Sequence, residues 1–71
     1  MAEEIKAPLA GKVISVLVEV GDSVEEDEEI MVLEAMKMET SVYSTAEGKV
    51  SQIRVRPGDS VEEDDILMTV E

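Results

Sequence analysis

The sequence repeats itself across almost its whole length, and this repeat limits the possible folds more than any other feature. Residues 7–34 align with residues 44–71 at a constant offset and without a gap, and thirteen of the twenty-eight aligned pairs are identical. The longest shared run, G-D-S-V-E-E-D, begins at Gly21 and again at Gly58. Because two copies are too few for a solenoid, we predict a single domain, residues 1–71, built from two halves related by a pseudo-twofold axis.

Each copy reads as short strands separated by turns. Valine is the most frequent apolar residue, and β-branched side chains favour strands. Gly21 and Gly58 each lie in a turn, where glycine supplies a left-handed backbone and the following Asp and Ser can bond local amides. The predicted strands are residues 4–7, 13–20, 30–34, 40–43, 50–55 and 66–70. Many short strands at regular spacing predict an all-β sandwich or barrel.

One segment has a competing interpretation. Residues 25–39, EEDEEIMVLEAMKME, are rich in strong helix formers, so intrinsic propensity favours a helix there. The counterpart in the second copy, residues 62–70, carries Asp64 and Asp65 and ends in ILMTV, which favours a strand. Residues 30–33 also form a continuous apolar run and not a one-face helical stripe. We therefore predict strand and turn here, and no helix longer than one turn anywhere.

Composition argues against several classes of function. The chain has no cysteine and no histidine, so it lacks thiolate ligands, disulfides and the commonest general base. Its formal net charge of −12 argues against nucleic acid and against direct contact with anionic membranes. The acidic runs at residues 25–29 and 62–65 match no calcium loop, so we predict no metal site. No apolar run suits a signal peptide or a membrane span, and we predict a cytoplasmic protein.

The repeat gives Lys37 a special position. Shifting residue 37 by the repeat offset in either direction falls just beyond a chain end, so the segment 35–43 is the counterpart of the place where the termini approach. We predict that Lys37 lies at one pole of the domain and the termini at the other. The strands on either side must be joined by Ala35-Met36-Lys37-Met38. A type I turn needs no glycine, and we predict Met36 and Lys37 at its central positions.

Three roles for Lys37 remain open on this reasoning. It can be a solvated turn residue, balanced by Glu34 and Glu39, with Met36 and Met38 filling gaps beneath the turn. It can be a Schiff-base nucleophile, although that role needs burial or a cationic neighbour to lower the pKa of the amine. It can also be a site of covalent modification, because a lysine on a protruding turn is accessible to a modifying enzyme.

The residues around Lys37 resemble a known motif. Glu34-Ala35-Met36-Lys37-Met38 is similar to the E-A-M-K-M attachment motif of biotinyl domains, the biotin carboxyl carriers of biotin-dependent carboxylases and decarboxylases. The resemblance extends to the opening turn A-P-L-A-G at residues 7–11. It also includes the paired G-D-S-V segments that begin at Gly21 and Gly58, with the lysine midway between them. Lipoyl domains share the fold but typically carry aspartate before the lysine and alanine after it, so the two methionines favour biotin.

The resemblance implies a fold and a site. The fold is a flattened barrel or sandwich of two four-stranded antiparallel sheets, a barrel-sandwich hybrid, with Lys37 on a hairpin. The site is Lys37 with covalent biotin, together with the motif residues Glu34, Ala35, Met36 and Met38. The methionines are expected to tune recognition by partner enzymes, whereas Glu39 stands at a variable position. The gapless alignment leaves no room for the protruding thumb that some carriers insert in their first half.

The resemblance also implies partners. A biotin protein ligase attaches the biotin, a biotin carboxylase loads carboxylate, and a carboxyltransferase passes it to an acceptor. The carrier itself is not an enzyme, and we expect the isolated domain to be monomeric. No Pro/Ala-rich linker of the kind that precedes many carriers occurs, so we expect a free-standing small carrier or a domain of a larger polypeptide. The alternatives are a lipoyl carrier domain of a 2-oxo acid dehydrogenase complex and an unmodified structural or adaptor domain.

Overall fold

The computed structural model describes residues 2–71, so Met1, the first residue of the predicted domain, lies outside the described residues. Every regular element in the described part of the chain is a strand. The eight strands are β1 (Glu3–Lys6), β2 (Gly11–Val16), β3 (Ser23–Val24), β4 (Glu29–Ala35), β5 (Met38–Tyr43), β6 (Gly48–Ile53), β7 (Ser60–Val61) and β8 (Ile66–Val70). Within these residues no helix is long and apolar enough to cross a membrane.

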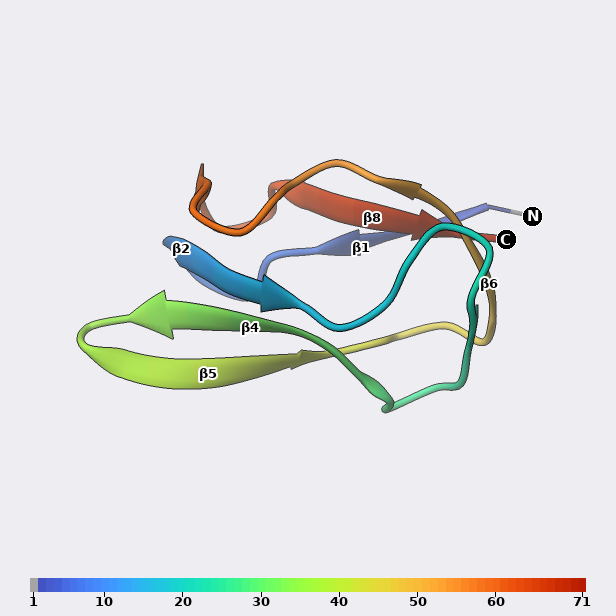
Figure 1. Cartoon of the computed structure of the whole chain (residues 1–71), viewed down its shortest axis with the longest axis horizontal. Coiled ribbons are helices and arrows are strands. Elements are labelled where there is room, and N and C mark those ends of the chain that lie inside the picture. Colours follow the sequence, from blue (N-terminus) through green and yellow to red (C-terminus); the bar gives the residue numbers. More distant parts are fainter. Residues whose placement is uncertain (1) are drawn as a thin grey trace.

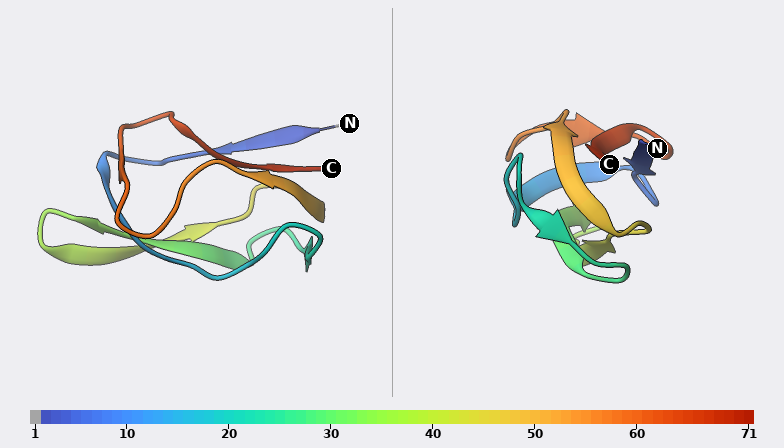
Figure 2. Two further views of the ribbon diagram at one scale, coloured as in Figure 1. Left: turned by 45° about the horizontal axis from the view of Figure 1, so that its top comes forward. Right: turned by 90° about the vertical axis from the view of Figure 1, so that its right-hand side faces the viewer.

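The strands form two four-stranded sheets with equivalent layouts. One sheet has the order β1-β8-β6-β3, the other has β5-β4-β2-β7, and all pairings within them are antiparallel. Advancing β2, β3 and β4 by the repeat offset gives β6, β7 and β8, so each sheet is the image of the other. The two sheets lie face to face in an elongated body (Figures 1 and 2). The predicted all-β class with two four-stranded antiparallel sheets and pseudo-twofold symmetry is confirmed.

The two halves are tied together by reciprocal backbone hydrogen bonds. The amide of Gly58 donates to the carbonyl of Val13, and the amide of Val13 donates to the carbonyl of Asp59, both at 2.8 Å. In the equivalent arrangement of the other half, the amide of Gly21 donates to the carbonyl of Val50 at 2.8 Å, and the amide of Val50 donates to the carbonyl of Asp22 at 2.9 Å. Each half therefore uses the other half's turn to satisfy backbone groups that would otherwise be unpaired at the end of a sheet.

The core between the sheets is aliphatic, as the composition requires. Met31 and Met68, which are repeat equivalents, are both fully buried. The buried apolar residues are Ile5, Ala7, Val13, Val18, Val24, Ile30, Met31, Leu33, Val42, Val50, Val61, Leu67, Met68 and Val70. The flexible, unbranched methionines fill the space that branched residues leave, which suits a core with no aromatic ring.

Several predicted strand boundaries are wrong. β1 ends at Lys6 and not at residue 7, β5 begins at Met38 and not at residue 40, and β2 and β6 each begin two residues earlier than predicted. β2 and β6 end at Val16 and Ile53, and not at residues 20 and 55. At that point the amides of Leu17 and Arg54 still donate across to Ile30 and Leu67, but the chain then bends into the next turn. β3 and β7, two residues each, were not predicted as strands, because a two-residue element carries no periodic signal. The competing helix at residues 25–39 does not form, and β4 and β5 occupy most of it.

The predicted turn glycines are confirmed. Gly21 and Gly58 have φ of 98° and 97°, a region that side chains with a Cβ adopt only with strain. A second equivalent pair, Asp27 and Asp64, also has positive φ, at 69° and 72°. Aspartate tolerates this region better than most residues. Each of these amides donates to the residue that opens the other repeat, Ser44 for Asp27 and Ala7 for Asp64. The halves therefore superpose in their turns as well as in their sheets.

Candidate functional site

The β4–β5 hairpin lies at one end of the molecule. The molecule measures 33 × 17 × 17 Å, and the hairpin extends along the long axis beyond the rest of the fold, at the end opposite the start of β1 and the end of β8 (Figure 1). The strands remain paired to the last possible residues, Ala35 and Met38, so Met36 and Lys37 alone form the connection. The predicted placement of Lys37 at one pole and of the termini at the other is therefore what the structure shows.

The turn itself differs from the prediction. Met36 and Lys37 have φ of 55° and 65°, so both central residues are left-handed and the turn is not type I. Positive φ at both positions of a two-residue hairpin loop is the signature of a type I′ turn. Such turns match the right-handed twist of paired strands, whereas a type I turn would splay them apart. The sheet therefore dictates the turn, and two residues that each have a Cβ accept a conformation costing about 1–2 kcal/mol apiece.

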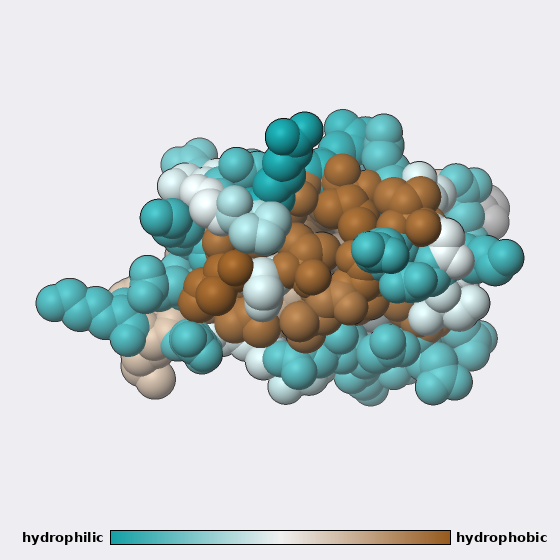
Figure 3. Space-filling model, in the orientation of Figure 1, coloured by the Kyte–Doolittle hydropathy of each residue, from teal (hydrophilic) through white to brown (hydrophobic). Residues whose placement is uncertain are grey.

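Both methionines beside the lysine face solvent. The side chain of Met36 is 94% exposed and that of Met38 is 69% exposed. They do not fill gaps beneath the turn, so that part of the solvated-turn interpretation is wrong. Lys37 is exposed as well. In the space-filling view the tip of this hairpin is a slender projection, in which hydrophilic residues extend furthest and moderately hydrophobic ones lie just behind them (Figure 3). Burial of the kind that activates a Schiff-base lysine is therefore missing at Lys37.

A row of charged side chains crosses the sheet just behind the tip. Glu34 on β4 pairs with Glu39 on β5 and with Lys12 on β2. All three residues are exposed. Like charges directly opposite each other destabilise a strand pair, and the cation of Lys12 on the other side of Glu34 offsets this. The sequence showed Glu34 and Glu39 near the lysine, but Lys12 is distant in sequence, and only the strand pairing places it here.

Gly11 supports the base of the hairpin by having no side chain. A Cβ at this position would lie 2.6 Å from the carbonyl oxygen of Glu34 and 3.4 Å from the Cβ of Ala35. The first distance is shorter than real contacts allow, and the atom it meets is backbone, which cannot rotate away. Gly11 therefore lets β2 approach β4 closely where the hairpin leaves the body. Sequence reasoning identified Gly11 only as a turn residue.

The other three lysines lie on strands of the body. Lys6 is in β1, Lys12 in β2 and Lys49 in β6. All three are exposed, so exposure alone does not distinguish them from Lys37. The distinction is geometric: their backbones are held in sheet ladders, whereas Lys37 occupies the end of a two-residue turn. An enzyme that must enclose a lysine side chain can approach the tip from several sides.

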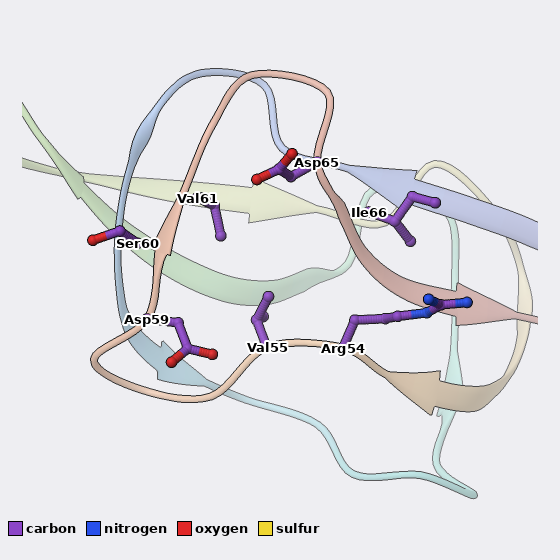
Figure 4. A pocket seen from close by; sticks show the side chains of 7 residues that line it. All are labelled: Arg54, Val55, Asp59, Ser60, Val61, Asp65 and Ile66. Atoms are coloured by element: carbon purple, nitrogen blue, oxygen red, sulfur yellow. The ribbon is translucent and has the colours of Figure 1, made fainter.

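An open pocket of about 460 Å³ on the second half is a weaker candidate for a site. Figure 4 shows its lining, with the Arg54 side chain extended away from the two aspartates. The carboxylate of Asp59 accepts a hydrogen bond from the backbone amide of Arg56 at 2.9 Å. The carboxylate of Asp65 accepts one from the backbone amide of Glu62, also at 2.9 Å. Both aspartates are thus used to hold turns, and we assign the pocket no ligand. Within residues 2–71 no group of three or more acidic side chains is arranged to hold a metal ion.

Comparison with known proteins gives a family. The family model described as "Biotin-requiring enzyme" matches residues 3–70. The biotin carboxyl carrier protein of Streptococcus mutans is 49% identical over 41 residues, which are 58% of this chain and 32% of that protein. The methylmalonyl-CoA carboxyltransferase 1.3S subunit of Propionibacterium freudenreichii is 60% identical over 37 residues, 52% of this chain and 30% of that subunit. The matched part is thus about a third of the length of these curated relatives.

Solved structures share the fold over nearly the whole chain. The urea carboxylase of Kluyveromyces lactis superposes with a TM-score of 0.93 at 34% identity, covering 100% of this chain and 6% of that one. A single-chain, multi-domain long-chain acyl-CoA carboxylase superposes with a TM-score of 0.88 at 29% identity, covering 96% of this chain and 7% of that one. In both cases the likeness is to a small part of a much larger enzyme.

Proposed function

This chain is a biotinyl domain that belongs to the family of biotin-requiring enzymes, and we propose that it works as a biotin carboxyl carrier with biotin attached to Lys37. The observation that carries the proposal is the place of the E-A-M-K-M motif. The motif, residues 34–38, spans the tip of the β4–β5 hairpin, and its lysine is one of the two residues that join the strands there (Figure 1). Motif and geometry are independent properties, and they select the same residue.

The residues at the tip fit a covalently held group. The amine of Lys37 is exposed, and an amide formed with the carboxyl group of biotin removes its positive charge and changes the net charge from −12 to −13. The attached group and the lysine side chain together form a flexible arm on a rigid β support. When bound, biotin supplies a ureido nitrogen that carries carboxylate. The left-handed backbone of Met36 and Lys37 fixes the direction in which the arm leaves the protein.

The chain's own contribution is then physical. A tethered group meets each partner's active site at an effective concentration set by the reach of the arm, and no catalytic side chain on the carrier is needed. We propose that the arm moves between a biotin carboxylase and a carboxyltransferase, and that a biotin protein ligase attaches the biotin. Docking to each partner must be transient, since a carrier that binds one enzyme tightly cannot reach the next.

Peptide mass spectrometry after incubation with a biotin protein ligase, biotin and ATP tests this function. We expect one biotin, on Lys37, and none on Lys6, Lys12 or Lys49. Lys37→Arg keeps the charge but replaces the amine with a guanidinium, so it should fold normally and take no label. Lys49→Arg is the matched control and should be labelled like the parent. Biotin on another lysine, or undiminished label in Lys37→Arg, would show that the assignment is wrong, and labelling by a lipoyl ligase instead would favour the lipoyl alternative.

A further inference from the structure

The two halves share a backbone but differ in the side chains that they expose along and just after β2 and β6. Ile14, Leu17 and Val20 in the first half are 38%, 50% and 61% exposed. We call these three residues the first-half face. Their repeat equivalents are Ser51, Arg54 and Pro57, which are also exposed. The same three surface positions are therefore apolar in one half and polar, charged or proline in the other.

The backbone around these positions is equivalent in detail. Ile14 and Ser51 each occupy the irregularity where the strand register shifts, between Val13 and Ser15 in β2 and between Val50 and Gln52 in β6. The amides of Leu17 and Arg54 make the same cross-strand bond, to Ile30 and Leu67, both at 2.9 Å. Since serine, arginine and proline satisfy the fold at these positions in the second half, the fold does not require apolar residues in the first.

The exposed apolar residues also come from one short segment, residues 14–20. Figure 3 shows an apolar area on this face of the molecule, which reaches from the region of β2 to that of the end of β6. Half-buried Val16 lies on β2, whereas half-buried Ile53 and Val55 lie at the end of β6 and just after it, so both halves contribute partly buried apolar residues that pack against the core. Single exposed apolar residues are normal on a protein surface, but a continuous area is typical of an interaction site.

Charge shows what chemistry would cover the first-half face. Glu19 lies between Leu17 and Val20 in the sequence. The carboxylate of Asp22 accepts a hydrogen bond from the backbone amide of Glu19 at 2.8 Å, so two acidic residues border the apolar ones. At the equivalent of Glu19 the second half has Arg56, so residues 17–20 carry one negative charge whereas residues 54–57 carry two positive charges. A second copy of the chain is disfavoured as an occupant, because each copy has a net charge of −12.

We infer that the first-half face is the surface by which the carrier docks on an enzyme that exchanges carboxylate with its biotin. The partner's surface presents an apolar patch bordered by lysine and arginine. This inference rests on the proposed carrier function. β2, which carries Ile14, and the chain that follows it lie along the side of the long axis, whereas the β4–β5 hairpin, which carries Lys37, is at its end (Figure 1). A partner that holds the side of the carrier thus leaves the arm free to enter a recessed active site beyond the contact.

The experiment replaces the first-half face with the residues that the second half carries. The triple variant carries Ile14→Ser, Leu17→Arg and Val20→Pro and is loaded with biotin. The KM of the biotin carboxylase and that of the carboxyltransferase of the same organism are then measured in separate half-reactions, with the carrier as the varied substrate. We expect KM for the carrier to rise about tenfold or more in at least one half-reaction with kcat little changed, since truncated apolar anchors weaken docking and not chemistry. Loading by the ligase, which acts at Lys37 on the tip, should be unchanged.

Two further variants make the result specific. Arg54→Leu, on the second half, is the matched control and should leave both KM values unchanged. Glu19→Arg reverses a border charge without touching the apolar residues, and it should raise KM at low salt by a factor that shrinks as salt screens the contact. If the triple variant proves too unstable to assay, Leu17→Arg alone and Glu19→Arg carry the test.

The outcomes separate this inference from the proposed function. A parent chain that takes no biotin on Lys37 overturns both. A biotinylated parent whose KM values are the same as those of the folded triple variant overturns only the docking surface. The docking surface is also overturned if ligase loading of the triple variant falls as much as its carboxyl transfer. It is overturned as well if the parent chain sediments as a dimer and the triple variant as a monomer.

Discussion

The two halves of this molecule are nearly the same structure put to two different uses. β2, β3 and β4 are matched by β6, β7 and β8, and the cross-bonding of the turns is matched almost to the tenth of an ångström. At the end of β4, however, the chain continues through Met36 and Lys37 into β5. At the equivalent end of β8, Val70 pairs with Glu3 at the start of β1, and no hairpin joins these two strands. The paired strands and turns are common to both halves, whereas the β4–β5 hairpin occurs only at the end of the first.

This difference separates the residues that fold the domain from the residues that give it a function. Positions where the halves agree, such as Gly21 and Gly58, are required by the backbone. Positions where they disagree although the backbone is the same, such as Leu17 and Arg54, are not required by it. An internal repeat thus provides a control within a single sequence, and three measurements test how far that control holds.

The largest effect should come from the buried methionines, which are repeat equivalents. Met31→Ala and Met68→Ala should each lower the free energy of unfolding by about 2–5 kcal/mol, because each leaves a cavity in a fully enclosed core. A domain of this size is stabilised by roughly 4–10 kcal/mol in total, so either variant should be close to unfolding. Urea denaturation measures both. Costs that differ by more than about 2 kcal/mol would show that the halves are not energetically equivalent.

The turn glycines should give the next largest effect, again in equal measure. Gly21→Val and Gly58→Val should each cost roughly 1–2 kcal/mol or more, since a β-branched residue resists φ near 97–98°. Nothing lies within 4 Å of a Cβ built at either glycine, so the cost is conformational and not a clash. Thermal midpoints measured for both variants check this. Midpoints equal to that of the parent would contradict the role of the left-handed turns.

The smallest effect concerns the hairpin, where the halves differ most. Met36→Gly should raise the free energy of unfolding by about 0.5–1 kcal/mol, because glycine adopts the left-handed conformation of this position without the penalty of a Cβ. Met38→Gly is the matched control. It lies in β5 with extended backbone and should instead lower stability by about 0.5–1 kcal/mol. Chemical denaturation resolves the signs, and a loss of stability in Met36→Gly would mean that the turn stores no strain.

The sequence alone was sufficient for the plan of the molecule. A gapless repeat of valine-rich segments and glycine turns determines two equivalent sets of strands, and the break between the copies determines the pole at which Lys37 lies. These inferences hold because hydrophobic periodicity and glycine turns are local properties, written in consecutive residues. The E-A-M-K-M motif is local in the same way, and its resemblance to biotinyl domains predicts the family whose model matches residues 3–70.

Other features depended on contacts between residues far apart in the chain. The sequence permitted a type I turn at Met36 and Lys37, but the twist of β4 against β5 imposes left-handed backbone on both. The two-residue strands β3 and β7 exist only because β6 and β2 lie beside them. Lys12 comes beside Glu34, and Gly11 clears the base of the hairpin, through the same sheet pairing. Sheet twist and strand register are collective properties of paired strands, so no single stretch of sequence encodes them, and only the tertiary structure decides them.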